Sequence, residues 1–145
     1  MTIVNVSMSV EQLGFPIRIK SKFKTLDEWL NALCDNKKPE KHIEEFVFNY
    51  YESSGKYTLH CRGINNYREV GTNTIKDFVR IEFKPKNMYF RLPHKEYRNL
   101  DRQQVNERIS NLLKEFVQTE KFKTSYLAEA DAIVTSYNGE KIWTK

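Results

Sequence analysis

The sequence predicts a single α+β domain spanning residues 1–145, with a largely antiparallel sheet and two helices packed on its apolar face. Three observations predict this class. Two segments place apolar residues at helical spacing, several short segments alternate with a period of two, and hairpin-length links join most of them. A chain of 145 residues has the length of one compact domain.

The first two expected elements are strands. Apolar residues occupy every second position of residues 3–10, which indicates one buried face. The segment "FPIRIKSKFK" then alternates apolar residues with the basic residues Arg18, Lys20 and Lys22. Pro16 has no N–H to donate to a ladder, so this strand begins there or lies at an edge.

Two helices are expected, over about 25–35 and 101–118. Thr25 and Glu28 form a capping-box pattern before the apolar spacing of "LDEWLNALC". In the second helix Asp101 takes the capping position, because an Asp side chain also accepts a backbone N–H. Apolar residues then recur at intervals of three and four, which predicts an amphipathic helix packed on the sheet.

The remaining strands are expected in hairpins. Segments 45–51 and 56–62 are joined by "ESSG", and residues 76–93 form two strands around the turn "KPKN". Between these hairpins, residues 63–74 are expected to be a loop with a short extended piece near 67–70. The tail "EADAIVTSYNGEKIWTK" predicts a strand, a tight Asn-Gly turn and a return strand.

Motifs of catalysis and metal binding are missing from the sequence. It contains no glycine-rich phosphate loop, no C-x-x-C and no H-E-x-x-H. Cys34 and Cys61 are the two cysteines, and both are expected to be small buried residues. Because neighbours on a strand point to opposite faces, His60 and Cys61 are not expected to pair with each other. We therefore expect no catalytic residue, no metal site and no cofactor.

Basic side chains on the polar faces of the strands are the main sign of a binding surface. The formal net charge is +5, which favours acidic proteins or polyanions as partners. A protein partner, single-stranded nucleic acid and a merely solvated face all remain open. Glu82 lies among the basic residues and weakens their field. The residues expected to bind a partner are Arg18, Lys20, Lys22, Arg80, Lys84, Tyr89 and Arg91.

A small, glycine-poor α+β chain without an active-site motif, ending in "FKTSYLAEADAIVTSYNGEKIW", resembles the immunity proteins of bacterial polymorphic-toxin and contact-dependent growth inhibition systems. The resemblance implies stoichiometric binding to a cognate toxin, without turnover. Members of these families are often acidic, and this chain is basic. A single-stranded nucleic-acid-binding protein that uses the same basic, tyrosine-bearing face is the alternative. The N-terminus has no basic leader followed by an apolar run, so a cytoplasmic location is expected.

Overall fold

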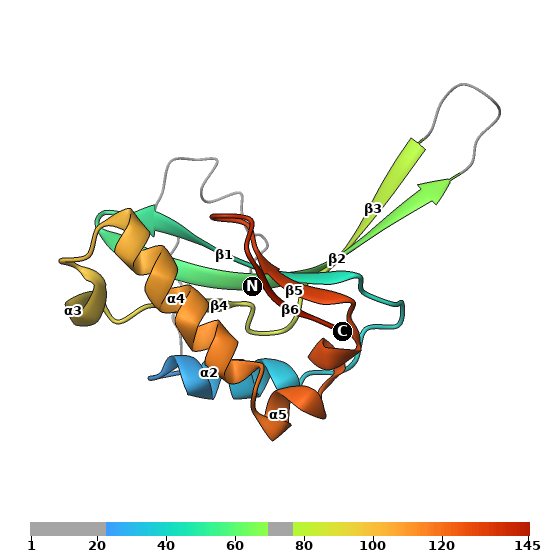
Figure 1. The fold of residues 1–145 in the computed structure, drawn as a ribbon, viewed down its shortest axis with the longest axis horizontal. Coiled ribbons are helices and arrows are strands. Elements are labelled where there is room, and N and C mark those ends of the chain that lie inside the picture. Colours follow the sequence, from blue (N-terminus) through green and yellow to red (C-terminus); the bar gives the residue numbers. More distant parts are fainter. Residues whose placement is uncertain (1–22, 70–76) are drawn as a thin grey trace.

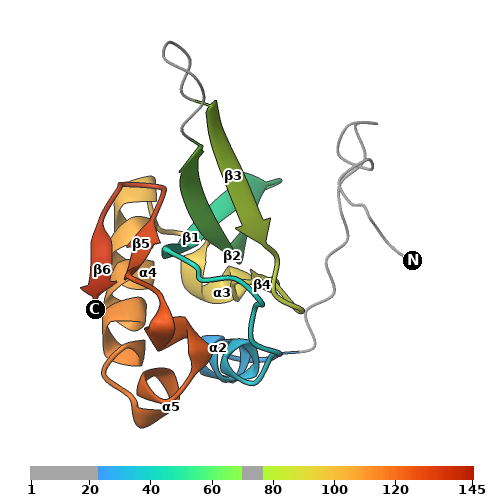
Figure 2. The same cartoon turned by 90° about the vertical axis from the view of Figure 1, so that its right-hand side faces the viewer.

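The computed structural model describes residues 23–69 and 77–145, and within them it shows an α+β fold. A six-stranded mixed sheet has the order β3-β2-β1-β5-β6, with β4 also paired to β2. The helices lie together on one face of this sheet, as Figures 1 and 2 show. The strands expected in residues 3–10 and after Pro16 fall almost entirely outside the described residues.

The hairpin of β1 (Glu45–Ser53) and β2 (Lys56–Glu69) confirms the expected connection through "ESSG". Ser53 pairs with Lys56, so two residues make the turn. Both of them have positive φ, 53° at Ser54 and 77° at Gly55. This conformation gives a two-residue turn the twist that suits an antiparallel pair.

β2 is longer than the sequence predicts, since it continues through much of the expected loop 63–74. The extra length of β2 comes from its pairing with another strand. β3 (Asp77–Phe83) pairs antiparallel with β2 from Gly63↔Phe83 to Glu69↔Asp77. This pairing overrides the turn-rich composition of the segment.

The expected hairpin around "KPKN" is wrong. β3 does not pair with β4 (Tyr89–Arg91); instead β4 pairs with Thr58–His60 of β2, further along the same edge. Since both strands are antiparallel to β2, they run in the same direction. Pro85 has no N–H for a ladder, and Asn87 takes a left-handed φ of 60°. The chain therefore leaves the edge of β2 and returns to it without reversing.

The tail forms the predicted strand and return strand, but the connection is longer than the expected tight Asn-Gly turn, since residues 136–140 lie between the two strands. β5 (Ala132–Thr135) and β6 (Lys141–Thr144) are antiparallel, and Gly139 in the connection has a φ of 69°. β5 also pairs parallel with β1, from Glu45↔Ala132 to Phe48↔Thr135. This one parallel pairing makes the sheet mixed.

Both predicted helices are confirmed. α2 (Leu26–Cys34) begins where Thr25 Oγ1 accepts the Glu28 N–H at 3.1 Å. α4 (Arg102–Phe116) has the full capping box, in which Asp101 accepts the Gln104 N–H at 2.8 Å and donates its own to Gln104 Oε1 at 2.9 Å. Three short segments were not expected: α3 (His94–Tyr97), α5 (Glu120–Lys123) and a 3₁₀ turn (Tyr126–Glu129).

The hydrophobic core lies between the sheet and these helices. Trp29 of α2 is fully buried, stacked on Phe90 at 5.7 Å and edge-on to Phe48 at 6.0 Å. Its indole N–H donates to the Asn87 carbonyl at 2.6 Å. The buried Trp29 side chain therefore keeps a hydrogen-bond partner for its one polar atom. Val105, Ile109 and Leu113 of α4 are fully buried in the same cluster. In residues 23–69 and 77–145, no helix combines the length and the apolar character needed to cross a membrane.

Candidate functional site

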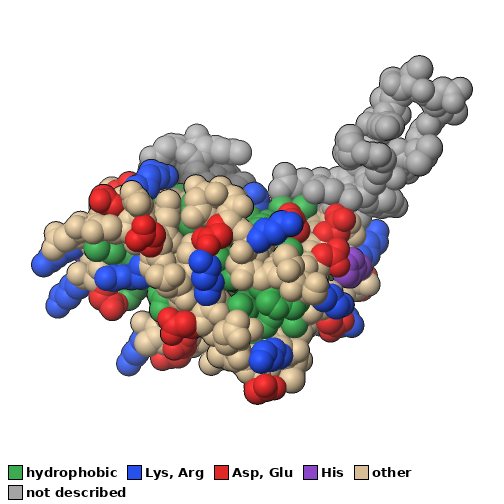
Figure 3. Space-filling model, in the orientation of Figure 1, with side chains coloured by type: hydrophobic (Ala, Val, Ile, Leu, Met, Phe, Trp, Pro, Cys, Tyr) green, Lys and Arg blue, Asp and Glu red, His purple; other side chains and the backbone are tan. Residues whose placement is uncertain are grey.

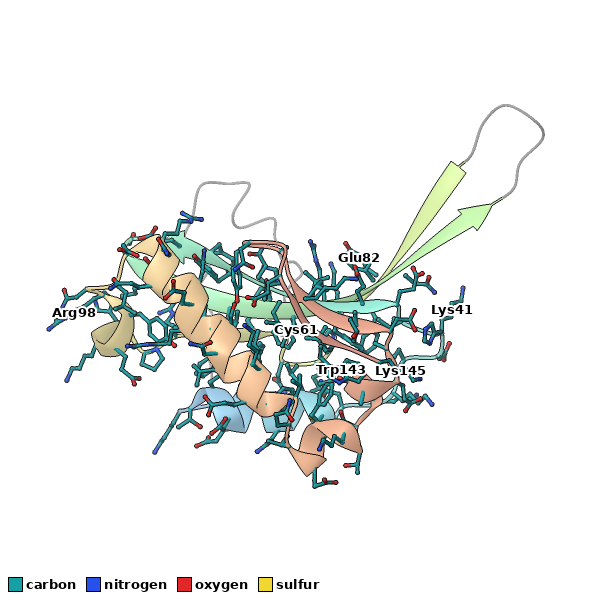
Figure 4. The ribbon with its side chains drawn as sticks, in the orientation of Figure 1. Lys41, Cys61, Glu82, Arg98, Trp143 and Lys145 are labelled. Carbon is teal, nitrogen blue, oxygen red and sulfur yellow. The ribbon has the colours of Figure 1, made fainter. Side chains whose placement is uncertain are left out.

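The candidate site is the sheet face that points away from the helices, which we call the polar face. The strand registers place Asn49, His60 and Tyr89 side by side on β1, β2 and β4, and Tyr51, Thr58 and Arg91 form the next row. Arg62 of β2 follows in the other direction, opposite Val47. Figure 4 shows Glu82 on this side of the sheet and Cys61 on the helix side. The polar face comprises Asn49, Tyr51, His60, Arg62, Glu82, Tyr89 and Arg91.

Of the residues expected to bind a partner, the structure brings two together. Tyr89 and Arg91 are two residues apart on β4, so both lie on the polar face. Lys84 is exposed in the loop that joins β3 to β4. Arg80 is placed only by its backbone, opposite Asn66 in the β2–β3 pairing. Arg18, Lys20 and Lys22 lie outside the described residues.

Five members of the polar face were not among the expected site residues: Asn49, Tyr51, His60, Arg62 and Glu82. The period of two already placed His60 and Arg62 on the outward side of their strand. It did not reveal that β4 lies beside that strand, and only this register brings them next to Tyr89 and Arg91.

Three aromatic rings form a row across the polar face. The His60 ring lies 6.1 Å from the ring of Tyr51 and 6.0 Å from that of Tyr89, measured between centroids. Burial, and secondarily the positive charge of Arg62, lower the pKa of His60 from 6.5 to about 4. The imidazole is therefore neutral at pH 7, and the row consists of three uncharged rings.

Two arginines of the polar face keep buried donors without an acceptor. The Nε atoms of Arg62 and Arg91 are buried and have no hydrogen-bond partner. Arg62 does have an ion pair with Glu82, at 3.6 Å, so this carboxylate partly neutralises Arg62. Among the described residues no carboxylate lies within 4 Å of Arg91. A guanidinium always carries its protons, and a buried N–H without an acceptor costs about 1–3 kcal/mol.

The alternating pattern of the strands predicts that the polar face is open to water, but several of its side chains are buried. Val47, Thr58 and Ile64 on this side are 4%, 5% and 4% exposed. The side chain of Arg62, by contrast, is 32% exposed, and Tyr89 and Arg91 are half-buried. The arginine and tyrosine side chains are thus the parts of this face that another molecule reaches.

The cysteines behave as buried residues. Cys61 is 0% exposed in the core, whereas His60 lies on the polar face, so the two do not form a nucleophilic pair. Burial raises the pKa of both the Cys34 and the Cys61 thiols, which keeps them protonated. Within residues 23–69 and 77–145 no group of three or more His, Cys, Asp or Glu side chains is arranged to hold a metal ion.

No protein-family model, no curated protein and no solved structure matches this chain. Its function is accordingly inferred from the chemistry of the polar face.

Proposed function

We propose that the chain is a non-enzymatic binding protein that neutralises a protein partner by covering it with the polar face. One observation carries this proposal: the half-buried Arg91 has no carboxylate of the described residues within 4 Å, and it lies on the same face as Arg62, whose side chain is 32% exposed. An acidic group of a partner would supply the acceptors that the described part of the chain lacks.

Arginine suits such a role because its planar guanidinium binds a carboxylate through two parallel hydrogen bonds. Arg and Tyr are also the residue types that contribute most to interface energies. Tyr89 lies beside Arg91 on β4, so the polar face offers both types together. The net charge of +5 would speed the encounter with an acidic surface, while the buried contacts would set the lifetime of the complex.

The resemblance to toxin-immunity proteins suggests which class of protein the partner belongs to. The partner would be a cognate bacterial toxin with an acidic surface near its working site, bound in the cytoplasm in a one-to-one complex. Inhibition would follow from steric cover of that site, with no chemical step.

The test uses the protein encoded by the gene next to this one as the titrant in calorimetry. Arg91→Ala is expected to weaken the complex about 30-fold or more, because truncating one partner of a buried charge pair costs about 2–5 kcal/mol. Arg98→Ala is the matched control, since Arg98 is exposed at the end of α3, away from the polar face. Figure 4 shows its position. The proposal would be refuted if no complex forms, or if the unaltered chain, Arg91→Ala and Arg98→Ala all bind with equal affinity.

The aromatic row favours a second candidate function, binding of single-stranded nucleic acid. Bases stack on aromatic side chains for about 1–3 kcal/mol each, and arginines beside the rings would hold the phosphates. Tyr51, His60 and Tyr89 form such a row next to two arginines. Binding of a labelled oligonucleotide should then fall log-linearly with salt and weaken in Tyr89→Ala. Absence of binding at low salt would eliminate this function.

A further inference from the structure

The connection between β5 and β6 is held on both sides of an exposed tip. Before the tip, Ser136 donates its N–H to the Phe48 carbonyl of β1 at 3.1 Å. After the tip, Glu140 Oε2 lies 2.6 Å from Lys114 Nζ of α4. Figure 2 shows this connection, in red, beside α4. The tip itself contains Asn138-Gly139, which is the one Asn-Gly pair of the sequence, and both of its residues are exposed.

The side-chain amide of Asn138 is oriented by two hydrogen bonds to its oxygen. Asn138 Oδ1 accepts from the Thr135 hydroxyl at 2.5 Å and from the Glu140 N–H at 3.1 Å. Thr135 is 1% exposed, so water does not compete for its hydroxyl. Two donors on a carbonyl oxygen stabilise the negative charge that develops there when a nucleophile attacks the carbon. Cγ of Asn138 is therefore activated toward such an attack.

A nucleophile lies next along the chain, the backbone nitrogen of Gly139. Its N–H donates no hydrogen bond to a described residue, so no other acceptor in that part of the chain holds it back. Gly139 has a φ of 69°, and a Cβ built on it would meet no atom within 4 Å. Because glycine has no side chain, this nitrogen is open to a close approach that a β-carbon would hinder.

We propose that Asn138 is a site of spontaneous deamidation, in which the Gly139 nitrogen attacks the side-chain Cγ. The nitrogen loses its proton and bonds to Cγ, the bond from Cγ to Nδ2 breaks, and ammonia leaves. The product is a five-membered succinimide ring. Water then opens the ring at either of its carbonyl carbons, which leaves an aspartate or an iso-aspartate at position 138. One water is consumed for each ammonia released, and the inference does not depend on the polar face.

Deamidation would place a new carboxylate beside the tie between the connection and α4. Figure 3 shows basic and acidic side chains interspersed on the face that carries α4 and the C-terminal strands, so the nearest charges decide its effect. These are Glu140 and Lys114, which already bind each other. An aspartate keeps an acceptor for the Thr135 hydroxyl and the Glu140 N–H. An iso-aspartate instead adds a carbon to the backbone, so we expect it to loosen the attachment of β6.

The test is peptide mapping by mass spectrometry of the folded protein after incubation in mildly alkaline buffer. The peptide with Asn138 should show the exchange of amide for acid before any peptide with another asparagine of residues 23–69 and 77–145. Its rate should be within about threefold of the rate in the same chain unfolded in urea. Earlier conversion of another described asparagine, or an unchanged Asn138 in the folded chain when the unfolded chain has fully converted, would overturn the proposal.

Two variants test the activation of Cγ. Thr135→Val removes the buried hydroxyl and should slow conversion of the folded chain at least threefold, with no effect on the chain in urea. Thr124→Val removes a hydroxyl from an exposed site at the end of α5 and should alter neither rate. An equal or faster rate in folded Thr135→Val would refute the role of this hydrogen bond. If that variant does not fold, the comparison of the folded and unfolded natural chain still decides the proposal.

Discussion

Gly63 is the position where the addition of a single methyl group should be most informative. A Cβ built there would lie 3.0 Å from Ile43 Cγ2, 3.0 Å from Phe46 Cε1 and 3.3 Å from Phe83 Cβ. Replacing Gly by Ala favours folding by about 0.4–1 kcal/mol, because it restricts the unfolded chain. Overpacking a buried site costs about 1–3 kcal/mol. Ile43 and Phe46 are 4% and 1% exposed, so they have little room to move, and the overlap should prevail.

We therefore expect Gly63→Ala to lower the free energy of unfolding by about 1–2 kcal/mol. With a urea slope of about 2 kcal/mol per molar, the midpoint should fall by about 0.5–1 M. Fluorescence of the buried Trp29 would report the transition.

A double-mutant cycle identifies the cause of this loss. Phe46→Leu removes the Cε1 atom that the new methyl group meets, so Gly63→Ala should cost less in that background than in the natural chain. An equal cost in both backgrounds, or a natural-background cost below about 0.5 kcal/mol, would refute the steric reasoning.

Three further outcomes are expected. Asp101→Ala removes the capping box of α4 and should cost about 1 kcal/mol in urea unfolding, while a loss below about 0.3 kcal/mol would contradict the cap. In a Cys34→Ser variant the remaining thiol, Cys61, should react with Ellman's reagent at pH 8 only after unfolding, because it is fully buried; prompt reaction of the folded protein would contradict its burial. His60 has a folded pKa of about 4, below its ordinary 6.5, so the unfolded chain binds a proton in this range and the folded chain does not. Stability should then be insensitive to this residue above pH 6.5 and decline as the pH falls from 6.5 to 4. An NMR titration of the His60 ring with a midpoint above 6 would disprove this assignment.

Local signals predicted the elements that local chemistry determines. The capping residues Thr25 and Asp101 mark the starts of both main helices, and their hydrogen bonds are formed. The turn at Ser54-Gly55 follows from residues that tolerate positive φ, and Gly139 uses the same freedom in the longer β5–β6 connection. Each of these signals depends on a few neighbouring residues, so the sequence displays it directly.

Pairing between distant segments was not predictable in the same way. A turn such as "KPKN" shows that the chain leaves a strand, but not whether it returns along that strand or continues along the long edge of β2. The same limit applies to the candidate site. Alternation assigned Arg91 and Tyr89 to the polar side, yet their neighbours His60 and Arg62 follow from the register of β4 on β2. The period of two gives the side of a strand, and only tertiary structure gives its neighbours.

The parallel contact of β1 with β5 joins residues more than eighty positions apart, such as Glu45 and Ala132. Until the C-terminal hairpin arrives, the long hairpin of β1 and β2 has an unprotected border of backbone N–H and carbonyl groups. Closing so long a loop is slow, and a chain emerging from the ribosome reaches this step only after β1 to β4 have been synthesised. Variants that hinder the docking of β5 should therefore lower the yield of soluble protein through aggregation, even where the finished fold tolerates them.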